Sequence, residues 1–160
     1  MRDRLFGVAL AGLLAASGSA AQEVRRVPYW ASLSAGEALM RTGPGKEYPA
    51  RWLYRRRGLP LRVIAVHDSW RKVADPDGET GWMLGALLTA ERGAIVTGNA
   101  PRPLRASPDD GARVSWRAAP GVVGRIGECG EGWCRMDVNG KRGWVRTAHI
   151  WGVDRGEVVD

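Results

Sequence analysis

The stretch MRTGPGKEYPARW, residues 40–52, recurs 64 positions later as LRASPDDGARVSW, residues 104–116. Each stretch places arginine second, proline fifth and tryptophan last. Three pairs of tryptophans match in order along the chain: Trp52 with Trp116, Trp70 with Trp133, and Trp82 with Trp144. The separation falls by only two positions across these pairs, which two small deletions in turns explain. Because six of the eight tryptophans match in order, the sequence predicts an internal duplication.

Each copy has the pattern of short strands joined by turns. Residues 61–66 and 122–126 are rich in strand-forming side chains. Asn139 and Gly140 suit a two-residue hairpin turn, in which both central residues take positive φ. The 22 glycines and nine prolines disfavour long helices. We therefore expect an all-β chain of two small five-stranded antiparallel barrels, since closing a sheet removes its exposed edges.

The first 21 residues have the layout of a secretory signal peptide. Arg2 and Arg4 precede an apolar run over residues 5–16, and residues 19–21 form a small-residue cleavage site before Gln22. The run is shorter than the roughly 20 apolar residues that a membrane span needs. A buried N-terminal helix is the alternative, but three glycines would weaken it. We expect residues 1–21 to be removed and the mature chain to be periplasmic or secreted.

The basic composition restricts the class of partner. The formal net charge is +7 and the isoelectric point is about 10.2, so the protein should attract anions. Charge alone does not select which anion is bound. Exported bacterial proteins meet lipopolysaccharide, anionic lipid headgroups and wall peptides with free carboxylates, whereas export separates them from most nucleic acid. We expect no nucleic-acid partner.

Few side chains in the sequence could support catalysis or metal binding. His67, Asp68 and Ser69 are neighbours in a predicted loop, where adjacent residues cannot form a nucleophile–base–orienter arrangement. His149 is expected to pack near Trp151. A metal site needs three or four convergent ligands, and the chain has only two cysteines and two histidines. We expect no enzyme activity, no cofactor and no metal, with a small hydrolase as the disfavoured alternative.

The order of the motifs resembles that of the bacterial SH3-like (SH3b) domain. The first copy carries Arg-x-Gly-Pro at residues 41–44, Trp-x-x-Val at residues 70–73 and Gly-Trp at residues 81–82. The second copy departs from this pattern, because Ser107 replaces Gly43 and the arginine-rich stretch of the first copy has no counterpart.

The resemblance implies both a domain organisation and a class of function. It implies two tandem SH3-like barrels, at residues 27–97 and 98–153, followed by a C-terminal tail at residues 154–160. Binding is the usual activity of such modules, and some bind peptidoglycan peptides. We expect an exported binding module for a peptide or an anionic cell-envelope component such as peptidoglycan. The alternative is a periplasmic scaffold or assembly protein that binds another protein.

The resemblance also indicates where a ligand would lie. The arginine-rich stretch RWLYRRRG, residues 51–58, falls in the long loop that flanks the SH3-like peptide groove. Arginine forks bind carboxylates and phosphates, and aromatic rings offer stacking surfaces. Alternatively, Trp52 and Tyr54 are buried and the arginines simply face water. The candidate ligand-binding residues are Trp52, Tyr54, Arg55, Arg56, Arg57, Trp70 and Trp133.

The matched tryptophans have two possible locations. Trp82 and Trp144 follow a glycine on a middle strand and are expected mostly in the core. Trp70 and Trp133 begin the strand after a short loop, a position that often faces the ligand groove in SH3-like folds. Tryptophan is enriched at binding sites but also fills small cores, so both locations stay open for this second pair.

Cys129 and Cys134 are the only cysteines. A redox pair usually has the Cys-x-x-Cys spacing at a helix start, and a zinc site lacks further ligands. Export would place the pair in an oxidising compartment. In the first copy the equivalent positions hold Val66 and Arg71, so the same loop forms there without cysteines. If the loop joins paired strands, the sequence predicts a Cys129–Cys134 disulfide that fixes the hairpin presenting Trp133.

Overall fold

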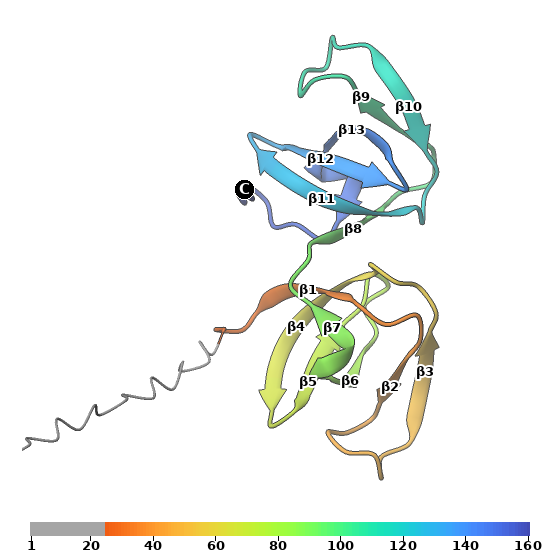
Figure 1. Ribbon diagram of the computed structural model, residues 1–160, viewed down its shortest axis with the longest axis vertical. Helices are drawn as coiled ribbons and strands as arrows, with labels where there is room; N and C mark the ends of the chain where they lie inside the picture. The colour runs from red at the N-terminus through yellow and green to blue at the C-terminus, as the bar shows by residue number, and fades with distance from the viewer. Residues whose placement is uncertain (1–24) are drawn as a thin grey trace, which may run out of the picture.

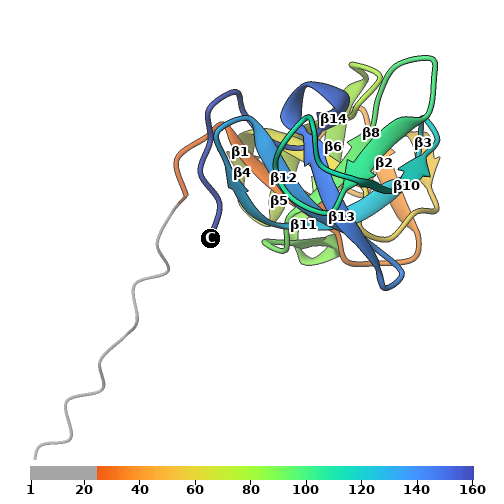
Figure 2. The same ribbon diagram turned by 90° about the horizontal axis from the view of Figure 1, so that it is seen from above.

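A computed structural model describes residues 25–160, so the expected signal peptide at residues 1–21 lies outside the described part of the chain. Two curved antiparallel sheets are stacked along the long axis of the molecule (Figure 1). Seen from above, one sheet lies over the other (Figure 2). Within residues 25–160, no helix has the length and apolar character needed to cross a membrane.

The first sheet contains seven strands in the order β3-β2-β6-β5-β4-β1-β7. A short 3-10 helix, η1 (Gly85–Leu87), precedes its last strand. The strands are β1 (Tyr29–Leu33), β2 (Ala38–Arg41), β3 (Ala50–Tyr54), β4 (Pro60–His67), β5 (Trp70–Ala74), β6 (Thr80–Leu84) and β7 (Leu88–Thr89).

The second sheet repeats this topology in the order β10-β9-β13-β12-β11-β8-β14. Its 3-10 helix is η2 (Thr147–His149). The strands are β8 (Gly93–Val96), β9 (Arg102–Arg105), β10 (Val114–Ala118), β11 (Val123–Gly130), β12 (Trp133–Val138), β13 (Lys141–Arg146) and β14 (Ile150–Trp151). The expected tandem pair of small all-β units is confirmed, with seven strands in each sheet instead of five.

The two units meet at β8, which differs from the boundary expected between residues 97 and 98. Ala94 and Ile95 of β8 pair with Gly124 and Val123 of β11, so the second sheet begins at Gly93. The segment expected as a C-terminal tail, residues 154–160, also contacts the second unit. There, Val159 forms an antiparallel bridge with Cys129.

Each sheet encloses its own apolar core, and a glycine, not the following tryptophan, faces that core. A Cβ atom on Gly81 would lie 2.5 Å from Cγ of Met40, and one on Gly143 would lie 2.7 Å from Cβ of Leu104. Because side chains alternate along a strand, Trp82 and Trp144 point away from the core and are only partly buried. The expectation that these two tryptophans fill the core is wrong.

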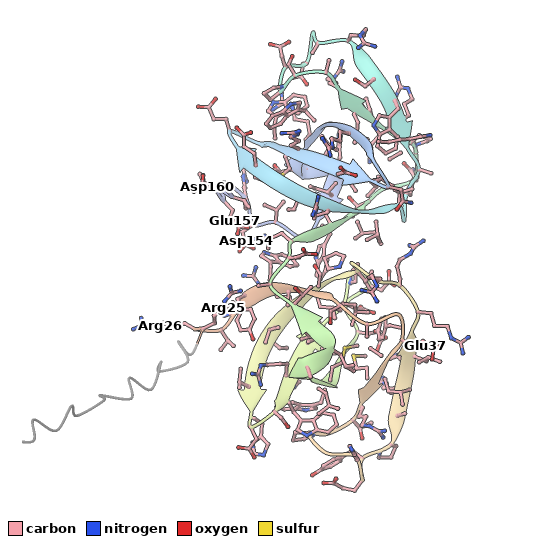
Figure 3. All side chains as sticks on the ribbon, in the orientation of Figure 1. Arg25, Arg26, Glu37, Asp154, Glu157 and Asp160 are labelled. Atoms are coloured by element: carbon pink, nitrogen blue, oxygen red, sulfur yellow. A yellow bond between two sulfur atoms is a disulfide. The ribbon has the colours of Figure 1, made fainter. Side chains whose placement is uncertain are left out.

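Aromatic and charged contacts join the two units. Trp30 of the first unit and Trp151 of the second pack edge to face, with their ring centroids 4.6 Å apart. The Arg62 guanidinium lies over the Trp30 ring and donates to both carboxylate oxygens of Asp154, at 2.8 and 2.7 Å. Asp154 and Glu157 lie where the units meet (Figure 3). The C-terminal segment therefore links the two units through the Arg62–Asp154 ion pair.

Candidate functional site

A surface groove of about 480 Å³ opens on the first unit, beside the β2–β3 hairpin. Its walls are apolar except for three charged side chains, Glu37, Arg41 and Lys46. The apolar lining residues come from β2, β3, β5, β6 and η1: Ala38, Leu39, Leu53, Trp70, Leu84 and Leu87.

The β2–β3 hairpin places two leucines on its outer face. Leu39 and Leu53 are opposite each other in the register and are 40% and 45% exposed. Met40, the next residue on β2, is fully buried in the core, as strand alternation requires. Exposed apolar side chains that line one groove mark a site that a ligand or partner could cover.

Trp70 forms the floor of this groove. Its side chain is only 9% exposed, yet it lies outside the apolar core cluster that contains Val73. Trp70 pairs with Leu84 of β6, and both side chains line the groove. The sequence left open whether Trp70 lies in the core or in the ligand groove, and the structure places it on the groove side of the sheet.

The charges of the groove lie at the two ends of β2. Glu37 precedes the strand and accepts a hydrogen bond from Nε of Arg55 at 2.8 Å. Arg41 ends the strand and donates to the backbone oxygen of Tyr48 at 2.8 Å, which fixes the loop that carries Lys46. A ligand in the groove therefore meets an apolar surface with positive charge at one end.

The other aromatic candidates do not line this groove. Trp52 is 47% exposed, but neighbouring side chains on a strand point to opposite faces. Trp52 therefore lies on the face of β3 that faces away from Leu53 and the groove. The Tyr54 hydroxyl donates to Oδ2 of Asp75 at 2.7 Å. Burial, together with that bond, raises the pKa of Tyr54 well above its ordinary value, so the phenol stays protonated. Tyr54 thus has a structural role in the sheet.

The arginine-rich stretch does not converge on the groove either. Arg55 bonds Glu37 at its rim, while Nη1 of Arg56 donates to the backbone oxygen of Gly121 in the second unit at 2.5 Å. Arg57 lines a separate hollow beside β8. The groove leucines that the sequence reasoning missed are Leu39, Leu53, Leu84 and Leu87. The only signal for Leu39 and Leu84 is their alternation with core residues along β2 and β6, and Leu53 and Leu87 carry no such signal.

At the equivalent surface of the second unit an ion pair lies over the matched tryptophan. Trp133 is buried and, like Trp70, stands outside the core cluster. The Arg146 guanidinium lies over its ring, 4.2 Å from the centroid, and binds the Asp110 carboxylate. The hydrogen bond from Arg146 lowers the pKa of Asp110.

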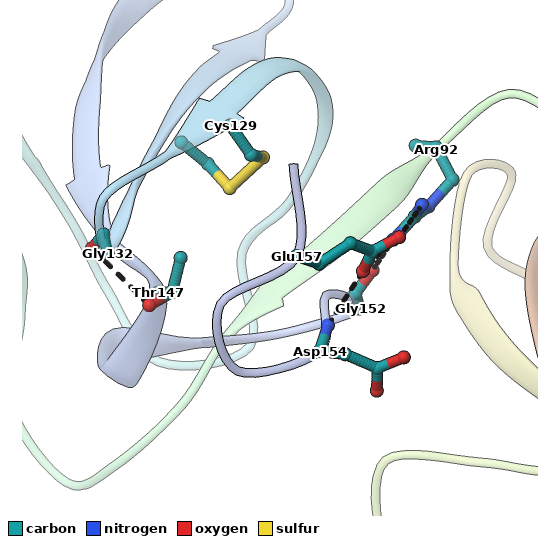
Figure 4. Close-up of a disulfide and its surroundings, with 8 residues drawn as sticks. Arg92, Cys129, Gly132, Thr147, Gly152, Asp154 and Glu157 are labelled. Atoms are coloured by element: carbon teal, nitrogen blue, oxygen red, sulfur yellow. Dashed lines mark hydrogen bonds and ion pairs between the residues drawn. A yellow bond between two sulfur atoms is a disulfide. The ribbon is translucent and has the colours of Figure 1, made fainter. Parts of the chain in front are cut away.

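The predicted disulfide is present. Cys129 and Cys134 are bonded, with their Cα atoms 4.1 Å apart, and they pair directly across β11 and β12 (Figure 4). Val66 and Arg71 occupy the same register position in the first unit, as the repeat alignment predicts. Val159 donates to and accepts from the Cys129 backbone at 3.1 and 2.8 Å, so the C-terminal segment pairs with β11 beside the disulfide.

The histidines lie apart from the groove. His67 is exposed at the end of β4, 3.7 Å from Oδ2 of Asp68. His149 is partly buried in η2, and burial lowers its pKa. Within residues 25–160, no group of three or more His, Cys, Asp or Glu side chains is arranged to hold a metal ion.

Comparisons with known proteins identify the fold family. The family model of the bacterial SH3 domain matches twice, at residues 34–89 and 99–152. No curated protein matches the sequence. Among solved structures, NlpC2 from Trichomonas vaginalis is similar over 82% of this chain and 52% of its own, with 11% identity and a TM-score of 0.36. An NlpC/P60 family protein from Bacillus cereus is similar over 77% of this chain and 56% of its own, with 14% identity and a TM-score of 0.35. The present chain thus spans about half the length of these two proteins.

Proposed function

The chain belongs to the bacterial SH3 domain family and contains two tandem copies, and on this basis we propose that it is an exported, non-enzymatic module that binds cell-wall peptides. The groove of the first copy is the proposed binding site. The observation that carries the proposal is this groove, with Trp70 as its floor and Leu39 and Leu53 at its rim. Export is proposed from the signal-peptide pattern of residues 1–21.

The lining of the groove suits a peptide. Apolar side chains and a tryptophan ring contribute contact area for aliphatic groups of a ligand. Arg41 and Lys46 supply positive charge at one end, where a free carboxylate of a wall peptide would be attracted. The lining offers binding groups but no nucleophile paired with a base, which supports a binding function over a hydrolytic one.

Retention of the mature protein by purified peptidoglycan, at low and at high salt, tests this proposal. We expect the wild type to be retained and Leu53→Asp to be lost, because a carboxylate would enter the apolar groove. The matched control is Val66→Asp, since Val66 is 42% exposed in the same unit but outside the groove. Absence of wild-type retention at both salt concentrations would exclude a wall ligand.

A second experiment separates the proposal from the alternative of a periplasmic scaffold. Crosslinking in cells should give no single dominant protein adduct if the ligand is a wall peptide. One discrete adduct, together with no retention by peptidoglycan, would favour the scaffold.

A further inference from the structure

The strands around the matched tryptophans have the same register in the two units. Arg41 pairs with Trp82 in the first unit, and Arg105 pairs with Trp144 in the second, so the strands superpose in register. Several groove positions of the first unit then have counterparts of different chemistry in the second. Leu84 becomes Arg146, Leu87 becomes His149 and Lys46 becomes Asp110, while Ala38 and Leu53 become Arg102 and Arg117.

These replacements convert an apolar surface into an arginine presented on an aromatic ring. The Arg146 guanidinium lies 4.2 Å from the Trp133 ring centroid, a cation–π arrangement that holds the planar fork in place. Its Nε donates to Oδ1 of Asp110 at 3.2 Å, and its Nη2 donates to Oδ2. This is the two-pronged geometry in which arginine recognises a carboxylate.

The carboxylate that occupies this fork comes from a surface loop. Asp110 lies in the loop between β9 and β10, and its side chain is 68% exposed. Exposed ion pairs contribute little to stability, because water competes for both partners. Exchange of Asp110 for another carboxylate therefore costs the fold little.

The surroundings favour an anion. Besides Arg146, Arg105 lies close enough to act on the Asp110 carboxylate, and Asp109 is the other acidic side chain that acts on Arg146. Arg105 donates from Nη1 to the backbone oxygen of Ala112 at 2.7 Å, which ties the same loop to β9. Positive potential thus remains when the loop acid is displaced.

We propose that the second unit carries a carboxylate-binding site, formed by Arg146 stacked on Trp133, and that Asp110 occupies it as an internal ligand in the free protein. The external ligand is a peptide with a free carboxylate. This inference concerns the second unit alone and does not depend on binding in the first groove.

The experiment follows the indole signal of Trp133 and the Nε signal of Arg146 by NMR. The probe is N-acetyl-glycyl-alanine, and its C-terminal amide is the matched ligand control. Asp110→Asn should bind the free acid about two- to fivefold more tightly than the wild type, because the competing internal carboxylate, held by an exposed ion pair, is gone. The amide should bind to neither protein.

Two further variants complete the design. Asp110→Asn combined with Arg146→Leu, which restores the leucine of the first unit, should abolish binding. Asp137→Asn removes an acid from another exposed pair, with Arg142 at 2.7 Å, and should leave the Trp133 response unchanged. The proposal is overturned if Asp110→Asn binds no more tightly than the wild type, if the amide binds equally well, or if the double variant still binds. Because Trp133 and Arg146 report on the second unit only, these outcomes are separate from the Leu53→Asp result.

Discussion

Leu39 and Leu53 face each other across β2 and β3, with 40% and 45% of their surfaces exposed above a buried Trp70. This pair lines an open apolar groove on the first unit, whereas on the second unit the Arg146 guanidinium lies over the matched Trp133. A duplicated fold has thus produced two surfaces of different chemistry. Side-chain replacements at a few matched positions account for the difference.

Trp70→Ala should destabilise the protein by about 3 kcal/mol, because it removes a buried aromatic ring and leaves a void beneath the groove. Trp52→Ala is the matched control, since Trp52 is 47% exposed, and should cost under about 1 kcal/mol. Urea denaturation followed by circular dichroism measures both changes in the free energy of unfolding. Equal losses for the two variants would contradict the placement of Trp70 as the groove floor.

Reduction of the Cys129–Cys134 disulfide should lower the free energy of unfolding by about 2 kcal/mol, since the bond closes only a short loop. The first unit forms the same hairpin with Val66 and Arg71, so the reduced protein should still fold. Thermal denaturation with and without reductant tests this. The Cys129→Ala/Cys134→Ala variant, which should not respond to reductant, is the control.

Gly81→Ala should destabilise the first unit by about 1–3 kcal/mol, because the added methyl would overlap Met40 in a packed core. Gly127→Ala, where a Cβ atom meets nothing within 4 Å, should change stability little. Differential scanning calorimetry of the two variants provides the comparison. A neutral Gly81→Ala would show that β2 and β6 are not as close as described.

Acid should weaken the ion pair between Arg92 and Glu157 in the C-terminal segment. Hydrogen bonds from Arg92, at 2.6 and 3.0 Å, hold the pKa of Glu157 below its ordinary value of 4.5. Because this pKa is lower in the folded state than in the unfolded state, the stabilisation is present above pH 4.5 and is lost as the pH falls through the folded-state pKa.

Glu157→Gln should therefore be less stable than the wild type at neutral pH and should approach it in acid. The difference between their melting temperatures, followed from neutral pH to well below pH 4.5, measures this effect. A difference that stays constant over the whole range would rule out the charged Arg92–Glu157 pair as its source.

Much of the fold could be predicted from the sequence because its signals are local. Matched tryptophans revealed the duplication, and the loop between Cys129 and Cys134 could be compared with its cysteine-free counterpart. The tryptophans of the two Gly-Trp pairs were misplaced, because a strand pattern gives alternation without saying which face is inward. Only the contact of Gly81 with Met40 decides that question.

The groove was harder to predict because it depends on contacts between distant segments. Arg55 and Arg56 look like a binding cluster in sequence, but they bond Glu37 and Gly121, which lie far from them in the chain. Leu39 and Leu53 carry no motif, and only the pairing of β2 with β3 brings them together. A sequence pattern therefore draws attention to clustered arginines that bind elsewhere in the fold, whereas the exposed leucines that line the groove carry no motif.

The central claim is that the first groove binds a wall peptide, and NMR of the mature protein with soluble peptides released from purified peptidoglycan tests it most directly. We predict saturable shifts of the Trp70 indole signal, while that of Trp82, on the same sheet but outside the groove, stays in place. No shift of the Trp70 signal at saturating peptide, or shifts confined to Trp82, would contradict the account.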